Sequence, residues 1–292
     1  MIGRRLLGLL AAALLAGSAQ ATPVRITDDL QHVVAFDQPP RRIVALLPSL
    51  TETVCALGDC DRLVGVDRYS NWPAQIEKLP RLGGLDDPQV EAIVALRPDV
   101  VLLAPSLRIQ DRLEALGLKV LVLQTRTQAD VRRVFQALGE MLGRPDPLAP
   151  WRAIDADMAR IAATVPASMR GRSVYFEVDA APYAAGASSF IGETLARLGL
   201  RNVVGPELGP FPKVNPEFVV RADPELIMIG RRNADSLEGR PGWARIRALK
   251  AHAVCAFDPA ESDVIARPGP RMAQGAEAMA RCLRLLAGGG AK

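Results

Sequence analysis

The chain has 292 residues, of which 49% are hydrophobic, and carries a formal net charge of +4. This length exceeds the usual size of a single hydrophobic core, so two domains are expected. The charge is too small and too evenly spread to indicate binding to nucleic acid or to an anionic membrane surface.

Residues 1–21 have the features of a secretory signal peptide. Two arginines precede the apolar stretch Leu6–Leu15, and residues 19–21 form a small-x-small cleavage site. The stretch is shorter than the roughly 20 residues that span a bilayer, and no other segment is long and apolar enough. No cysteine lies near the cleavage site, so we expect neither a lipid anchor nor membrane insertion. Cleavage near Thr22 lowers the net charge from +4 to +2, because both charges of the signal are positive.

A first lobe is expected over residues 22–144. Val24–Phe36 alternates loosely and predicts a small hairpin, and the buried strand Arg42–Leu47 follows. Ser49 and Glu52 have the spacing of a capping box, so this strand leads directly into a helix. The helix N–H groups then point outward at the carboxyl edge of the sheet, where open α/β sheets bind ligands. Ser49 is therefore a candidate ligand-binding residue.

Strands and helices continue to alternate in this lobe. We expect strands at 63–66, 100–103 and 119–123, and helices at 109–116 and 129–142. From about Leu148 to Ser168 the apolar residues recur at helical spacing, and no strand interrupts them. A helix of about 20 residues would extend about 30 Å, which is enough to cross between two lobes. We therefore predict a linking helix within residues 145–170.

A second lobe is expected over residues 171–287, followed by a short tail at 288–292. We expect strands at 173–178, 226–229 and 253–257, and helices at 189–198, 243–249 and 270–286. Ser188 or Ser189 is a candidate cap for the first of these helices. The alternation of strands and helices predicts an α/β protein whose parallel sheets carry helices on their faces.

One pattern occurs in both halves. Glu91–Leu103 and Glu217–Ile229 each begin with a glutamate that opens a short apolar helix, and a proline seven residues later ends it. An acid and an unbroken apolar run follow, as in a strand buried on both faces. The repeat predicts two lobes of similar build with two equivalent glutamates. The alternative is a chance likeness, because helix-Pro-Asp-strand units are common.

The four cysteines are consistent with an oxidising compartment. We favour the pairs Cys55–Cys60 and Cys255–Cys282, although the sequence allows three pairings. A metal site is the weaker alternative, because neither a Cys-x-x-Cys pair nor a nearby histidine accompanies these cysteines. His32 and His252 lie far apart in the sequence and are expected at the surface.

The sequence lacks the common catalytic signatures, among them Gly-x-Ser-x-Gly, His-Glu-x-x-His and the phosphate and dinucleotide loops, so no enzyme is expected. The loops at the expected lobe edges instead hold aromatic side chains, which suit a bulky and partly apolar ligand. These are Tyr69 and Trp72 in the first lobe and Tyr183 and Phe211 in the second. The alternative is that each packs under its own loop. Asp263 and Arg267, in an expected loop at 261–268, either pair with each other or present polar groups to a ligand.

Five motifs together carry a resemblance to a known family. They are Arg42–Glu52, Gly65-Val66-Asp67, Tyr69–Pro73, Leu96–Asp99 and Pro270-Arg271. With them the chain resembles, over nearly its whole mature length, the periplasmic binding proteins that serve ABC importers of cobalamin, siderophores and haem. The resemblance implies two Rossmann-like lobes joined by a single long helix, with the ligand in the cleft between them. It also implies a periplasmic protein without cofactor or catalytic residues that delivers its ligand to an ABC permease, and we expect a monomer.

Within that family the chain is most similar to the vitamin B12-binding branch, so the resemblance implies cobalamin as the ligand. The resemblance implies a ligand-binding role for Tyr69, Leu85, Tyr183, Phe211, Asp263 and Arg267, and the candidates Ser49 and Trp72 from the residues themselves complete the expected ligand-binding set. The residues implied to dock onto permease arginines are Glu91 and Glu217. Leu85 and Ala104 stand where that branch can hold tryptophan, and the disulfide partner expected near Leu198 is absent. Haem, which takes an axial His or Tyr, and a ferric siderophore are alternatives. A further alternative is an enzyme that acts on such a macrocycle through Asp263 or Glu261.

Overall fold

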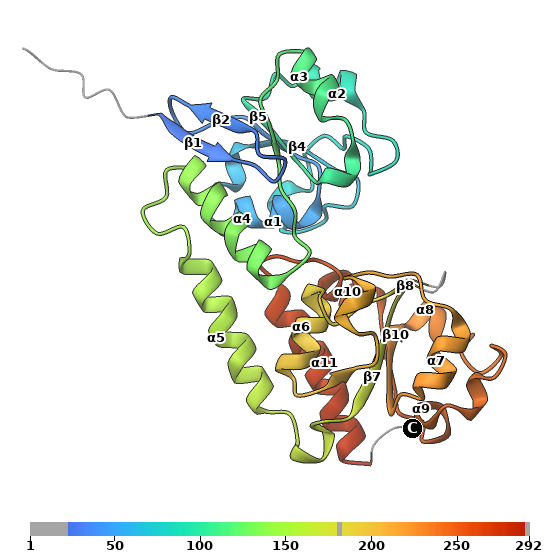
Figure 1. Ribbon diagram of the computed structural model, residues 1–292. Helices are drawn as coiled ribbons and strands as arrows, with labels where there is room; N and C mark the ends of the chain where they lie inside the picture. The colour runs from blue at the N-terminus through green and yellow to red at the C-terminus, as the bar shows by residue number, and fades with distance from the viewer. Residues whose placement is uncertain (1–22, 180–182, 290–292) are drawn as a thin grey trace, which may run out of the picture.

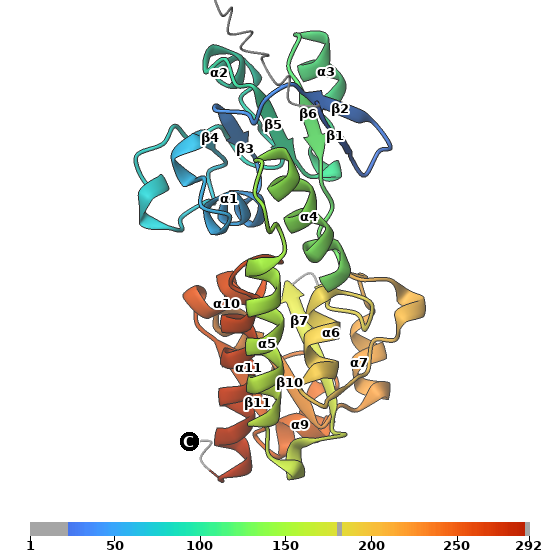
Figure 2. The same ribbon diagram turned by 90° about the vertical axis from the view of Figure 1, so that its left-hand side faces the viewer.

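The computed structural model describes residues 23–179 and 183–289. The expected signal peptide lies outside these residues, as do residues 290–292 of the expected tail. The described chain forms two lobes, stacked one above the other in Figures 1 and 2, and each lobe is built on its own sheet. The prediction of a two-lobed α/β protein with parallel sheets is confirmed.

The first lobe holds a four-stranded parallel sheet in the order β4-β3-β5-β6. The strands are β3 (Ile43–Ala45), β4 (Leu63–Val66), β5 (Val100–Leu103) and β6 (Val120–Val122), and the helices are α1 (Pro48–Ala56), α2 (Val90–Ala95), α3 (Gln110–Ala115) and α4 (Gln128–Met141). Alternate residues of β5 pack on opposite faces, with Val100 toward α1 and α4 and Val101 toward α2 and α3. Both faces are therefore buried, as the unbroken apolar runs predicted. The expected hairpin forms as β1 (Val24–Thr27) and β2 (Val33–Phe36).

The second lobe has the sheet order β11-β10-β7-β8, with β9 also paired to β7. Its strands are β7 (Ser173–Asp179), β8 (Tyr183–Ala184), β9 (Arg201–Asn202), β10 (Leu226–Gly230) and β11 (Val254–Phe257), and its helices are α6 (Phe190–Arg197), α7 (Pro216–Ala222), α8 (Arg231–Ala234), α9 (Arg247–Lys250), α10 (Pro259–Ile265) and α11 (Met272–Ala287). All strand pairs are parallel except β7 with β8. Ser189 caps α6 by accepting a hydrogen bond from the Gly192 N–H, which selects between the two expected caps.

The linking helix α5 (Ala149–Ala163) is shorter than the 20 residues expected. Its 15 residues extend about 22 Å, and Pro166, at the head of a short 3-10 helix, cannot continue it. The four residues Trp151, Ile154, Met158 and Ile161, which gave the helical spacing, are all buried. Figure 2 shows α5 running alongside α11, so this helix lies against the second lobe instead of standing free between the lobes.

The repeated pattern forms equivalent structures in the two lobes. In each copy the residue before the proline, Arg97 or Asp223, has a left-handed backbone with φ of 44° or 43°. The acid after the proline, Asp99 or Glu225, then accepts a hydrogen bond from a backbone N–H at the start of the neighbouring strand. The Asp99 carboxylate accepts from the Arg42 N–H at 2.9 Å, and the Glu225 carboxylate accepts from the Ser173 N–H at 2.9 Å. The turn and its hydrogen bond therefore recur along with the sequence, as two lobes of similar build would require.

The hydrogen bond of Glu225 predicts a loss of stability in acid. The Ser173 backbone N–H holds the pKa of Glu225 below its ordinary value of 4.5. A lowered folded-state pKa means that the stabilisation is complete above about pH 4.5 and is lost as the pH falls through the lower value. We expect the Tm of the unaltered protein to fall more than that of Glu225→Gln between about pH 5 and about pH 3. Thermal unfolding with Glu238→Gln as the charge-matched control checks this, and parallel pH profiles for all three proteins would contradict it.

Three local predictions are wrong. Ser49 does not cap α1, because the helix begins at Pro48 with Leu47 as its N-cap, so the Ser49 hydroxyl lies inside the first turn. The helix expected at 243–249 is two short pieces, Trp243–Arg245 and α9, separated by an extended Ile246. The loop expected at 261–268 contains helix α10, which a capping box between Asp258 and Glu261 starts two residues after β11.

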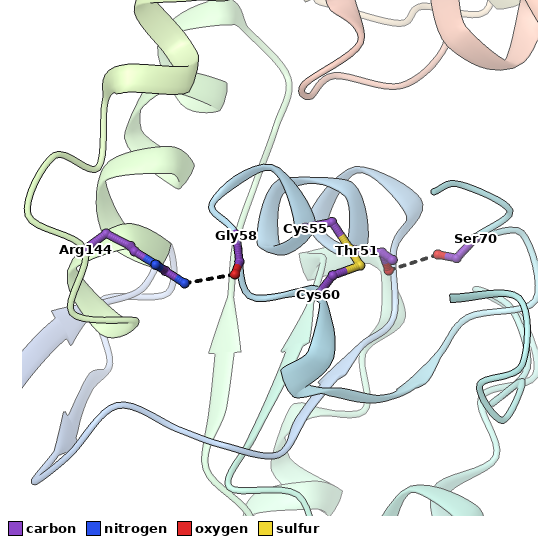
Figure 3. Close-up of a disulfide and its surroundings, with 6 residues drawn as sticks. All are labelled: Thr51, Cys55, Gly58, Cys60, Ser70 and Arg144. Atoms are coloured by element: carbon purple, nitrogen blue, oxygen red, sulfur yellow. Dashed lines mark hydrogen bonds between the residues drawn. A yellow bond between two sulfur atoms is a disulfide. The ribbon is translucent and has the colours of Figure 1, made fainter. Parts of the chain in front are cut away.

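Both favoured disulfides form. Cys55–Cys60 closes the end of α1 onto the segment before β4 (Figure 3), and Cys255–Cys282 joins β11 to α11. Beside the first of them, Arg144 donates to the Gly58 carbonyl at 3.0 Å and pairs with the buried Asp59. The end of α1 is thus linked both to the segment that leads into β4 and to the segment that leads into α5.

Candidate functional site

A cavity of about 820 Å³ lies between the two lobes. The segments that follow the carboxyl ends of β3, β4, β5 and β6 form its first-lobe wall. Its second-lobe wall comes from the end of β7, the start of α6, the segment around Phe211 and the end of α10 with the turn that follows. Open α/β sheets bind ligands at the carboxyl ends of their strands. In this protein the carboxyl ends of both sheets face the same cavity.

Six of the eight expected ligand-binding residues line this cavity. They are Ser49, Tyr69, Leu85, Phe211, Asp263 and Arg267, and Ala104 lies there too. Trp72 and Tyr183 do not line it. Trp72 lies under the Arg271 guanidinium, 5.0 Å from its ring centroid, and Tyr183 is on the outward face of β8, since the next residue, Ala184, is fully buried.

The middle of the cavity is apolar and aromatic. The Tyr69 and Leu85 side chains are 58% and 44% exposed, so they are available to a ligand. Phe211 packs against Phe190 with ring centroids 5.9 Å apart, a pair that the sequence analysis missed because Phe190 reads as an ordinary helix residue. Gly186 supports this wall, because a Cβ at that position would lie 2.2 Å from the Gly209 carbonyl oxygen, and its N–H donates to the Pro210 carbonyl at 2.9 Å.

Arg267 joins the lobes at one end of the cavity. Its guanidinium donates to the Asn71 side-chain oxygen at 2.6 Å and to the Tyr69 carbonyl at 3.1 Å, both in the first lobe. It also pairs with Asp263 on its own lobe at 2.9 Å. Both interpretations of Asp263 and Arg267 from the sequence therefore hold in part: they pair with each other across one turn, and both line the cavity.

The same end holds a buried ion triad that we call the interlobe triad, formed by Glu52, Arg267 and Arg271. Glu52, from α1, is 1% exposed, and the two arginines come from the other lobe. Arg267 Nη1 lies 3.1 Å from Glu52 Oε1, and Arg271 Nε lies 3.0 Å from Glu52 Oε2. Sequence analysis had assigned Glu52 to a helix cap, and its partners lie more than 200 residues away, so no local signal could reveal this contact.

Asp67 shapes the loop that presents Tyr69. Its carboxylate accepts from the Tyr69 N–H at 2.7 Å and also bonds the Ser70 hydroxyl, which lies 3.0 Å from the Thr51 hydroxyl (Figure 3). Burial raises the pKa of Asp67, while these hydrogen bonds and the charge of Arg267 oppose the rise. Asp67 is therefore a structural acid that fixes the rim of the cavity.

The two glutamates of the repeat lie away from the cavity. Glu91 is in the first turn of α2 and Glu217 in the first turn of α7, where Asn215 caps the helix. In Figure 1 both helices lie on the right-hand side, opposite α5. The Glu91 side chain is 82% exposed and pairs with the exposed Arg112 at 2.6 Å, and Glu217 is also exposed. Each lobe thus carries one exposed carboxylate in the first turn of a short helix.

Neither a metal centre nor a membrane span is found within residues 23–179 and 183–289. No group of three or more His, Cys, Asp and Glu side chains in them is arranged to hold a metal ion. His32 is held by Gln110, with the Gln110 amide nitrogen 2.6 Å from its Nδ1, and His252 lies in a left-handed turn. None of the helices in this part of the chain has the length and apolar character to cross a bilayer.

Comparisons with known proteins match the whole two-lobed chain. An uncharacterised ABC transporter substrate-binding lipoprotein of Bacillus subtilis is 29% identical, with 94% of each chain covered. A cobalamin-binding protein of Halobacterium salinarum is 28% identical over 89% of this chain and 73% of its own. The crystal structure of a periplasmic haem-binding protein from Pseudomonas aeruginosa superposes with a TM-score of 0.71 at 26% identity, covering 84% of this chain and 92% of its own. The family described as periplasmic binding protein matches residues 43–261, and the chain belongs to this family.

Proposed function

We propose that this chain is the periplasmic substrate-binding component of an ABC importer, and that it captures cobalamin or a related corrinoid between its lobes. The observation that carries the proposal is the cavity of about 820 Å³ between two sheet edges. This volume lies in the upper part of the range of about 300–1,000 Å³ for pockets that bury most of a small-molecule ligand. Its apolar middle and polar ends suit a large ring system with polar substituents.

The function of a relative supports the same ligand. The Halobacterium salinarum protein, aligned over 89% of this chain, is a cobalamin-binding protein. Tyr69, Leu85 and Phe211 would cover the faces of a corrin ring, and Asp263 with Arg267 would meet polar groups at its edge. Nothing in this arrangement calls for turnover, so the ligand would leave the protein chemically unchanged.

Haem is the second candidate, and a specific observation favours it. The Tyr69 side chain lines the cavity and is 58% exposed, so its phenol is available as an axial ligand to iron. Tyr183, the other tyrosine expected at a lobe edge, lies outside the lining. A ferric siderophore would be recognised by clustered positive charge, and two of the three arginines that line the cavity, Arg68 and Arg267, are already paired with acids.

Titration calorimetry with cyanocobalamin and with haemin tests the proposal. We expect a one-to-one complex with cyanocobalamin, and Phe211→Ala should weaken it about tenfold, because the substitution removes a ring that packs on the ligand. Phe218→Ala, a ring truncation outside the cavity, is the matched control. The ligand recovered after incubation should have an unchanged absorption spectrum. Absence of binding to any corrinoid would overturn the corrinoid assignment, and a chemically altered product would show an enzyme.

A further inference from the structure

One arginine that lines the cavity has no side-chain partner among the described residues. Three arginines line it, and two of them are paired: Arg267 with Glu52 and Asp263, and Arg68 with Asp87. The guanidinium of Arg126 makes neither an ion pair nor a hydrogen bond with any residue that the structure describes. Arg126 is exposed and lines the cavity, so its guanidinium is available to an anionic group of a ligand bound there.

The backbone of Arg126 is fixed by hydrogen bonds on both its N–H and its carbonyl. Its N–H donates to the Asp130 carboxylate at 3.0 Å, and its carbonyl accepts from the Phe190 N–H of the other lobe at 2.7 Å. Asp130 is itself occupied, because it completes the capping box of α4 with Thr127 and pairs with Arg133. The nearest acid in sequence therefore does not neutralise the Arg126 side chain.

The position of Arg126 gives the cavity two unlike ends. It follows β6, at one edge of the first-lobe sheet, whereas Tyr69 and Asn71 follow β4 at the opposite edge. The β4 end holds Asp263 and Arg267 in balanced ion pairs. The β6 end has a free cation beside Ser106 and Thr125, which carry neutral hydroxyl groups.

We propose that Arg126 forms a subsite for an anionic oxygen-acid group, a phosphodiester or a carboxylate, carried at one edge of the ligand. The inference rests on the proposed function and deepens it. A guanidinium binds such a group through two parallel hydrogen bonds, which also orients the ligand. A corrinoid with an intact nucleotide loop brings a phosphodiester, and a haem brings two carboxylates.

A thermodynamic cycle tests the subsite. Calorimetry compares cyanocobalamin with dicyanocobinamide, which lacks the phosphodiester, and haemin with its dimethyl ester, in which the carboxylates are blocked. In whichever pair binds, we expect Arg126→Gln to weaken binding of the ligand that carries the anionic group about tenfold and that of the analogue without this group less than twofold. Arg126→Lys should restore part of the loss. Arg132→Gln, on the exposed face of α4, is the charge-matched control and should change neither affinity.

Salt supplies a second readout. Raising the ionic strength from about 0.05 M to about 0.5 M should weaken binding of the ligand that carries the anionic group to the unaltered protein and should have little effect on Arg126→Gln. If Arg126→Gln weakens this ligand and the analogue without the anionic group equally, the subsite is overturned and the proposed function stands. Failure of the unaltered protein to bind either pair would overturn both the subsite and the proposed function.

Discussion

Replacing Glu52 by alanine is expected to destabilise the protein by about 3–5 kcal/mol. The substitution removes the only carboxylate of the interlobe triad, so Arg271 loses this partner, whereas Arg267 keeps Asp263. The two guanidinium groups belong to side chains that are only 10% and 11% exposed, and a mostly buried charge without its partner costs more than the lost ion pair itself. Denaturant unfolding followed by circular dichroism measures the loss as a lower midpoint with an unchanged slope.

Two further variants separate charge from packing at this site. Glu52→Gln keeps the volume and removes the charge, so it should lose most of the same free energy of unfolding. Asp157→Ala breaks the ion pair with Arg160 on the surface of α5 and should cost less than about 1 kcal/mol. A loss below about 1 kcal/mol for both Glu52 variants would show that the triad contributes no more than a surface pair.

Replacing Glu91 and Glu217 together by alanine is expected to abolish transport while leaving ligand affinity unchanged. Under the proposed function these carboxylates bind arginines of the permease, one for each lobe, and neither lines the cavity. In the free protein Glu91 is paired with Arg112, so the permease has to displace that arginine. Uptake of labelled cyanocobalamin, by cells that depend on this chain for it, measures the effect beside calorimetry on the purified variant.

Charge-matched controls make this result specific. Glu140→Ala combined with Glu238→Ala removes one exposed acid from each lobe and should leave uptake intact. Arg112→Ala frees Glu91 and should leave uptake unchanged or increase it. Normal uptake by the Glu91 and Glu217 double variant would refute the docking role, and a loss of ligand affinity in that variant would assign these residues to binding instead.

The sequence predicts most of the fold because its signals are local. Apolar runs and prolines place β5 and β10 almost to the residue, and the spacing of Trp151 to Ile161 identifies α5. The failures are also local. Pro48 starts α1 before Ser49 can cap it, and the box from Asp258 to Glu261 starts a helix where a loop was expected.

The candidate site is predicted only in part, because its geometry depends on distant partners. Family resemblance placed five of the residues that line the cavity and the strand-to-helix pattern placed Ser49, but Trp72 instead lies under Arg271 in a cation–π contact across the lobes. Glu52, Arg267 and Arg271 meet over separations of more than 200 residues. Arg126 stands out only because the acids near it are already engaged by other residues. The sequence alone does not show which acids lie near it or what engages them.

One of the apolar clusters extends from one lobe to the other, whereas each lobe also has a cluster of its own. A single cluster of buried side chains includes Leu50 and Phe135 of the first lobe, Ile154 of α5, and Phe190 and Met279 of the second. Unfolding of either lobe would therefore expose apolar side chains of the other lobe to water. Heating should therefore melt the molecule in one cooperative step, and a fragment that contains one half alone will lack the surface against which it folds.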